Sequence, residues 1–137
     1  MPYEPLVIVP RSEINQTVAV AEQVLPTQCN GSFIIPFPAG VRVLPWLPRE
    51  NQGLLVDIRL VGLLPSQQIA RHVDVPDRPF TRYHVVLRTN DQCWSFSENH
   101  WERLHEGMVY RMNPAQPHGA VNWGDTIRLH LMIDVEA

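Results

Sequence analysis

The chain has 137 residues, of which 45% are hydrophobic and 18% are charged, so it suits a single domain with one core. Its net charge of −3, without a basic run, gives no electrostatic basis for binding nucleic acid or a membrane surface. The N-terminus has no signal-peptide pattern, no apolar run is long enough to span a membrane, and Cys29 and Cys93 are far apart. These features predict a cytoplasmic protein with two free thiols.

The first fifty residues predict one helix among short, irregular strands. A short strand is expected at residues 6–9. Ser12 is a candidate N-cap of a helix whose apolar residues recur at helical spacing, namely Ile14, Val18, Ala21 and Leu25. Residues 26–50 are rich in proline and glycine, with bulky apolar residues between the turns. We expect short irregular strands there, and a loop that reaches over another part of the protein.

From residue 53 onward the pattern is one strand after another. Seven segments separated by turn signals are predicted strands: 54–63, 67–75, 81–89, 92–97, 107–112, 119–123 and 126–135. Short strands at close spacing are typical of a sandwich or barrel. We therefore expect one mainly β domain over residues 1–137, with the helix and irregular strands in residues 1–50 and a β-barrel core in residues 53–135.

Two segments of this region carry polar side chains on a shared face. Alternate residues of a strand project to the same side, so His72 lies with Asp74, and Arg82 lies with His84. Two histidines and one carboxylate form the ligand set that holds non-haem Fe(II). His118, 46 residues after His72, is a candidate second histidine. The alternative is a solvated face of a surface sheet.

The last predicted strand also has two different faces. Ile127, Leu129, Leu131 and Ile133 form an apolar face, which leaves Arg128, His130 and Met132 on the other. Arg128 is either an exposed charge or a buried guanidinium that binds a carboxylate through two hydrogen bonds.

The ordered pattern of HxD, RxH, PH and an arginine ten residues later resembles the Fe(II)/2-oxoglutarate-dependent oxygenases. Within them it is most similar to the aspartyl/asparaginyl β-hydroxylase-like group, which includes small proline hydroxylases, over roughly residues 53–135. Founding members of this group have a glycine at the position of Asp74, so the chain resembles the proline-hydroxylase-like branch more closely. The implied fold is a double-stranded β-helix, a jelly-roll or cupin-like barrel, with one N-terminal helix.

The resemblance also implies roles for individual residues. The iron ligands would be His72, Asp74 and His118. Arg128 would bind the distal carboxylate of 2-oxoglutarate, and Arg82 and His84 would contact this co-substrate near its metal-chelating end. Some members hold 2-oxoglutarate through a hydroxyl from an upstream strand, and the segment LLVDIRLVGLL offers none.

The implied activity is a dioxygenase that uses Fe(II), 2-oxoglutarate and O₂. It would hydroxylate a C–H bond of an amino acid, a peptidyl side chain or a small metabolite, and convert 2-oxoglutarate to succinate and CO₂. Further candidates for contact with substrate, or for support of the site, are His130, Asn122, Trp101 and Trp94. Each has a plainer interpretation: wall packing for His130, a turn for Asn122, and core or rim packing for the two indoles.

Two other classes of protein compete with this interpretation. His118 and Asn122 after Gly107 are similar to the second half of a cupin motif, which would suit a metal-dependent isomerase or a dioxygenase without 2-oxoglutarate. A cupin, however, has HxH and a downstream glutamate in its first motif. The third class is a non-catalytic β-barrel binding module. A chain this short could also borrow a pocket wall from a partner subunit, which makes an oligomer a hypothesis.

Overall fold

The computed structural model describes residues 2–25, 33–37, 46–47, 55–74 and 80–136. In this part of the chain one helix is accompanied by ten strands: β1 (Glu4–Ile8), α1 (Arg11–Glu22), β2 (Phe33–Pro36), β3 (Leu55–Leu63), β4 (Gln68–His72), β5 (Phe80–Arg88), β6 (Cys93–Ser97), β7 (His100–Glu102), β8 (Met108–Met112), β9 (His118–Asn122) and β10 (Arg128–Glu136). The predicted mainly β fold with one N-terminal helix is confirmed.

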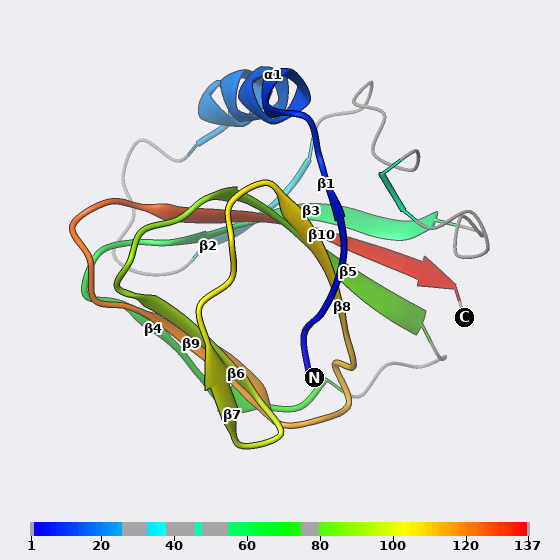
Figure 1. Ribbon diagram of the computed structural model, residues 1–137, viewed down its shortest axis with the longest axis vertical. Helices are drawn as coiled ribbons and strands as arrows, with labels where there is room; N and C mark the ends of the chain where they lie inside the picture. Colours follow the sequence, from blue (N-terminus) through cyan, green and yellow to red (C-terminus); the bar gives the residue numbers. More distant parts are fainter. Residues whose placement is uncertain (1, 26–32, 38–45, 48–54, 75–79, 137) are drawn as a thin grey trace.

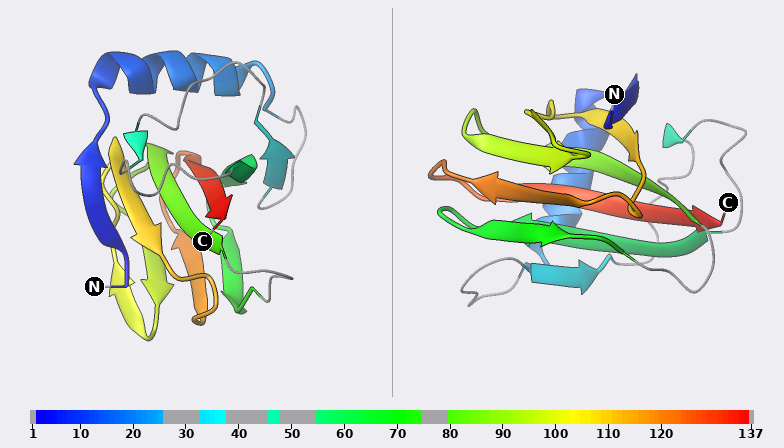
Figure 2. Two further views of the ribbon diagram at one scale, coloured as in Figure 1. Left: turned by 90° about the vertical axis from the view of Figure 1, so that its right-hand side faces the viewer. Right: turned by 90° about the horizontal axis from the view of Figure 1, so that it is seen from below.

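The strands form two antiparallel sheets that face each other. One has six strands in the order β1-β8-β5-β10-β3-β2, and the other has four in the order β4-β9-β6-β7. Figure 1 shows the two sheets opposed, with α1 on the side of the larger sheet that is turned away from the smaller one. The turned view at the left of Figure 2 repeats this order of layers. The arrangement is that of a jelly-roll barrel covered by one helix.

Strand periodicity divides the larger sheet into two different faces. Odd-numbered side chains of β5 and β10 pack with α1 in the main core, among them Tyr83, Val85, Leu87, Leu129, Leu131 and Ile133. From the helix, Ile14 and Ala21 are fully buried in the same core. Full burial of a side chain such as Ile14 contributes roughly 1.5–3 kcal/mol. Even-numbered side chains of the same strands face the smaller sheet, among them Arg82, His84, Arg128 and His130 of the predicted site. Arg88 is an exception, because it lies beyond a register shift in the β5–β10 pairing and bonds to Glu22 of α1.

The helix begins differently from the prediction. Arg11 is its first residue and Pro10 is its N-cap, with φ −54° and ψ 140° and no side-chain cap hydrogen bond. The prediction that Ser12 caps the helix is therefore wrong. Proline has a fixed φ that suits the start of a helix, so the chain turns helical before it reaches the serine.

All seven strands predicted after residue 53 are present, and one further strand was missed. β7 follows β6 through Glu98 and Asn99, which have φ values of 52° and 67°. A two-residue hairpin turn needs positive φ at both central positions, and glutamate gives no signal for that conformation. The short strand predicted at residues 6–9 is present as β1, and within residues 26–50 the structure describes the strand β2. Residues 26–32, 38–45 and 48–50 lie outside the described residues, and so does Cys29. Cys93 is a buried free thiol.

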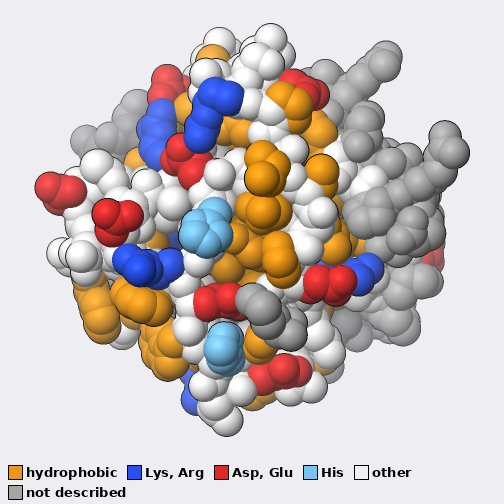
Figure 3. Space-filling model, in the orientation of Figure 1, with side chains coloured by type: hydrophobic (Ala, Val, Ile, Leu, Met, Phe, Trp, Pro, Cys, Tyr) orange, Lys and Arg blue, Asp and Glu red, His pale blue; other side chains and the backbone are white. Residues whose placement is uncertain are grey.

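Strand β1 lies at an edge of the larger sheet, where Val7 and Ile8 are exposed. Figure 3 shows hydrophobic side chains gathered along the part of the surface that β1 crosses. Among the described residues, no helix is both long and apolar enough to cross a membrane.

Candidate metal site between the two sheets

His72, Asp74 and His118 form one cluster at the smaller sheet. His72 is the last residue of β4 and is the direct cross-strand partner of His118, the first residue of β9. Asp74 follows β4, and its backbone N–H donates to the carbonyl of Pro114 (3.0 Å). One ligand atom from each of the three side chains lies within 4.8 Å of the others. The structure thus brings together the three predicted metal ligands.

Hydrogen bonds orient both imidazoles of the cluster. His72 Nδ1 lies 2.8 Å from the carbonyl oxygen of Ala70, and His118 Nδ1 lies 2.8 Å from that of Gln116. A carbonyl only accepts, so each Nδ1 carries the proton and each Nε2 offers a lone pair. These Nε2 atoms lie 3.7 and 3.3 Å from the Asp74 carboxylate oxygens. Burial lowers the pKa of His118, which also favours the neutral, ligating form.

Arg82 connects the cluster to β10. Its Nη1 donates to Asp74 Oδ2 (2.5 Å), while its Nε and Nη2 donate to the two carboxylate oxygens of Asp134 (2.9 and 3.1 Å). The pairing follows from the sheet, because Arg82 and Asp134 are direct cross-strand partners on β5 and β10. Its two carboxylate partners raise the pKa of Arg82 despite its burial. Arg82, which the family resemblance implies to lie near the metal-chelating end of the co-substrate, therefore contacts a candidate metal ligand.

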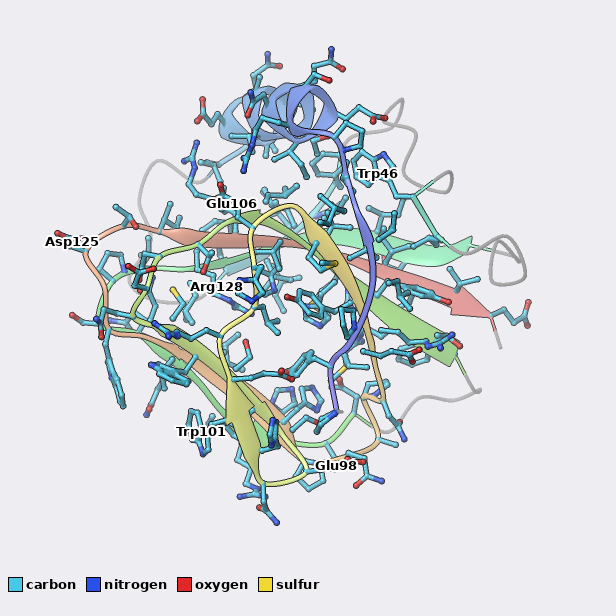
Figure 4. All side chains as sticks on the ribbon, in the orientation of Figure 1. Trp46, Glu98, Trp101, Glu106, Asp125 and Arg128 are labelled. Carbon is cyan, nitrogen blue, oxygen red and sulfur yellow. The ribbon has the colours of Figure 1, made fainter. Side chains whose placement is uncertain are left out.

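Arg128 is buried between the sheets, with 4% of its surface exposed, and Figure 4 shows it in the space that the two sheets enclose. Its Nε donates to His130 Nε2 (3.1 Å), and His130 Nδ1 lies 3.0 Å from His84 Nδ1. Burial lowers the pKa of Arg128 to about 10, so the guanidinium keeps its charge at neutral pH. Its Nη1 is buried and has no hydrogen-bond partner in the part of the chain that the structure describes. A buried donor of this kind is costly unless an acceptor is supplied to it.

The cluster and the arginines share one cavity of about 110 Å³. Of the described residues, three guanidinium groups and one carboxylate line it, and the remaining lining is imidazole, a phenol, backbone and apolar side chains: Tyr3, Ile34, Arg59, Val61, Ile69, His72, Asp74, Arg82, His84, His118, Gly119, Ala120, Arg128 and Met132. Cations outnumber anions, so the cavity suits an anionic ligand together with a metal ion.

Of the further candidates, His130 lies beside the site and the others lie away from it. His130 is buried between Arg128 and His84. Asn122 donates to the carbonyls of Leu63 and Thr126 (both 2.9 Å), which agrees with its interpretation as a turn residue.

The two indoles project from the outer face of the smaller sheet. Ser97 and Ser95 pair with His118 and Ala120, which line the cavity, so the two serines face inward. Trp94 lies between Ser95 and Cys93 in the strand, and its side chain therefore points to the outer face. Trp101 packs against Phe96 at 4.6 Å on that outer face and is 50% exposed. Figure 4 shows Trp101 outside the space between the sheets. This position agrees with core or rim packing of the two indoles, and it does not agree with contact with a substrate in the space between the sheets.

Three residues at the site were missed from the sequence. Asp134 shares the even-numbered face of Arg128 and His130, and Arg59 alternates in the same way on β3, so strand parity could have found both. Tyr3 offers no such signal, because it precedes β1. Its hydroxyl donates to the Phe96 carbonyl (3.4 Å), its ring contacts that of His84, and burial raises its pKa to about 12.

The fold and the site define a jelly-roll protein with a two-histidine, one-carboxylate cluster in a cationic cavity. The family model of aspartyl/asparaginyl beta-hydroxylase matches residues 32–137. The chain belongs to this family, which confirms the family expected from the motifs.

Individual relatives agree with this assignment. The chain is similar to L-proline cis-4-hydroxylase of Rhizobium meliloti (strain 1021), with 41% identity over 81 residues, which are 58% of this chain and 29% of the relative. It thus spans less than a third of that protein's length.

Solved structures show the same fold. The viral collagen prolyl hydroxylase of Paramecium Bursaria Chlorella virus-1, solved with 2-oxoglutarate, matches with a TM-score of 0.73 and 11% identity, over 100% of this chain and 97% of that one. A cupin domain of Bordetella pertussis Tohama I matches with a TM-score of 0.55 and 13% identity, over 82% and 100% of the two chains.

Proposed function

We propose that the protein is an Fe(II)- and 2-oxoglutarate-dependent dioxygenase that hydroxylates a C–H bond of an amino acid, a peptidyl side chain or a small metabolite. The observation that carries the proposal is the shared cavity, in which the His72–Asp74–His118 cluster lies with a buried arginine nitrogen that lacks an acceptor among the described residues. The donor set suits Fe(II), and the orphaned nitrogen suits a carboxylate. The residues present thus fit both groups.

Each residue then has a proposed role. His72, Asp74 and His118 hold the metal, and Arg128 binds the distal carboxylate of 2-oxoglutarate. When bound, the iron and co-substrate would supply the oxidising chemistry: O₂ would place one oxygen atom in the hydroxyl of the product and the other in the succinate formed, with CO₂, from 2-oxoglutarate. His84, also in the cavity lining, is proposed to contact the co-substrate near its chelating end. A contact of Arg82 with the co-substrate stays a prediction, because its described hydrogen bonds go to Asp74 and Asp134.

The test is to add Fe(II) and then 2-oxoglutarate to the purified protein without oxygen, and to record the weak visible absorption band of the chelate. The proposal expects the band with wild type and none with His118→Ala. If metal binds but 2-oxoglutarate gives no band, the cupin-type alternative is favoured. If neither binds, the enzyme proposal fails and a binding module becomes the better interpretation.

The substrate is tested by turnover. The relative in Rhizobium meliloti is named for L-proline, and the viral neighbour for collagen prolyl residues. We therefore propose free L-proline and short prolyl peptides as the first compounds to assay, with succinate formation and mass gain of the substrate as the two readouts. Succinate formed without a heavier product would show uncoupled turnover and would exclude that compound. We further propose that the protein acts in the cytoplasm.

A further inference from the structure

Asp134 is a buried carboxylate that lies behind the site and is absent from the lining of its cavity. Its side chain is 7% exposed. It accepts hydrogen bonds from two arginines of neighbouring strands: Arg82 through Nε and Nη2 (2.9 and 3.1 Å), and Arg59 through Nη2 (2.9 Å). Asp134 is therefore fixed between two guanidinium groups that themselves line the cavity.

The contact with Asp134 determines where Arg82 can point. Two parallel N–H donors on one carboxylate fix the plane of a guanidinium as well as its position. The centre of the Phe80 ring lies 5.1 Å from Cζ of Arg82, and the ring restricts the plane of the guanidinium further. Nη1 is the nitrogen left over, and it donates to Oδ2 of Asp74.

Asp74, by contrast, has little else to hold its carboxylate. It lies after the end of β4, and its side chain is 31% exposed, whereas that of His118 is 9% exposed. The carboxylate is a hydrogen-bond acceptor with free rotation unless a donor orients it. Arg82 is the donor that does so among the described residues, because both imidazoles of the cluster present the lone pair of Nε2 to Asp74.

We propose that Asp134 is a positioning residue of the metal site, which acts through Arg82 to orient the Asp74 carboxylate toward the two imidazoles. The inference rests on the proposed function, because it assumes that this cluster holds a metal. The negative charge of Asp134 has a second effect. Without it, the Arg82 cation would have Asp74 as its main partner and would compete with the metal for that carboxylate.

Replacement of Asp134 by asparagine tests both effects. The amide retains the shape, but it loses the charge and turns an N–H₂ group toward arginine donors. We expect Asp134→Asn to weaken binding of Mn(II), measured by calorimetry without co-substrate or oxygen, by about 10- to 100-fold, as outer-shell changes at metal sites do. Asp125→Asn is the matched control. This exposed aspartate lies far from Arg128 in Figure 4, and the change should leave the Mn(II) affinity unaltered.

A second readout follows Arg82 itself. In nitrogen-15 spectra of the metal-free protein, the Nε–H signal of Arg82 should exchange slowly with water, and Asp134→Asn should make it exchange faster. A role confined to general stability would leave metal affinity unchanged after correction for the fraction folded. Circular dichroism of the metal-free variant gives that fraction.

The outcomes separate this inference from the proposed function. If wild type binds Mn(II) and Asp134→Asn binds it equally tightly, the inference is overturned while the proposed function stands. If wild type binds no metal, both fail. If Asp134→Asn does not fold, Arg82→Lys replaces it, because lysine keeps the charge but cannot hold both carboxylates in a fork. Unchanged Mn(II) affinity in Arg82→Lys would likewise overturn the inference.

Discussion

His84 on β5 and His130 on β10 meet inside the barrel, with their Nδ1 atoms 3.0 Å apart. Burial is the main cause that holds the pKa of each imidazole well below 6.5, and the positive charge of Arg128 is the second cause. The folded protein therefore keeps both rings neutral at pH values where the unfolded chain protonates them. This difference links the stability of the fold to pH.

The free energy of unfolding should fall as the pH drops below about 6.5, because the unfolded state then binds more protons. The loss is up to about 1.4 kcal/mol per pH unit for each histidine, and none is expected above that pH. Urea unfolding of the metal-free protein between about pH 7 and pH 5 measures this slope. His130→Asn should reduce the slope, because the variant has one buried histidine fewer whose proton binding differs between the folded and unfolded states. Equal slopes in wild type and His130→Asn would contradict the argument.

His118→Ala should abolish metal binding while the fold persists. The imidazole offers Nε2 to the cluster, and alanine removes this ligand without adding a group that must be buried. We expect the Mn(II) affinity to fall by more than the roughly 100-fold upper range of outer-shell changes. Calorimetry measures it, with the exposed His105→Ala as the control. If His118→Ala binds Mn(II) as tightly as wild type does, the metal site lies elsewhere in the protein.

Arg128→Ala should spare metal binding and raise the 2-oxoglutarate concentration needed for half-saturation. Hydrogen bonds to charged groups are worth about 1.5–3 kcal/mol, so the expected increase is roughly 10- to 100-fold. The visible band of the anaerobic complex gives the titration curve. Arg11→Ala, which removes a surface ion pair with Glu106, is the control. An unchanged requirement for 2-oxoglutarate would refute the role of Arg128.

Gly119→Ala should harm both the fold and the metal site. A Cβ at this position would lie 2.6 Å from the Ile69 carbonyl oxygen and 2.7 Å from the Phe96 ring. One of these must move, and Gly119 directly follows His118. We expect a loss of about 1–3 kcal/mol of stability, typical of overpacking, together with weaker Mn(II) binding. Thermal unfolding measures the loss of stability, and calorimetry measures the Mn(II) affinity. If both quantities equal those of wild type, Ile69 of β4 and Phe96 of β6 can move to accommodate the methyl group at little cost.

The parity of residues in strands explains how much of the site could be predicted. Arg128 and His130 were placed on one face of the last strand from alternation alone, and the structure has them there. Asp74 was expected to share a strand with His72, but β4 ends at His72 and a hydrogen bond to Pro114 positions the aspartate instead. The residue roles carried over from the family remain predictions, as does the assignment of all 137 residues to one domain.

Other features depended on information that no local pattern carries. Trp94 was a candidate for contact with substrate beside the plainer interpretation of core or rim packing, and its strand pairing turns it to the outer face. The contact of Arg82 with Asp134 joins residues 52 positions apart, so it follows from the β5–β10 register and not from either segment by itself. Tyr3 reaches the cavity from a segment before the first strand.

The division of β5 and β10 into a helix-facing set and a cavity-facing set has a consequence for how this protein can change. A point substitution alters one set and leaves the other in place. The insertion of a single residue near the start of β10 would instead exchange the two sets. Leu129, Leu131 and Ile133 would then be turned toward the metal site, and Arg128, His130 and Asp134 toward α1. The lengths of these two strands should therefore tolerate far less variation than the residues within them, and insertions should be confined to the turns that connect the strands.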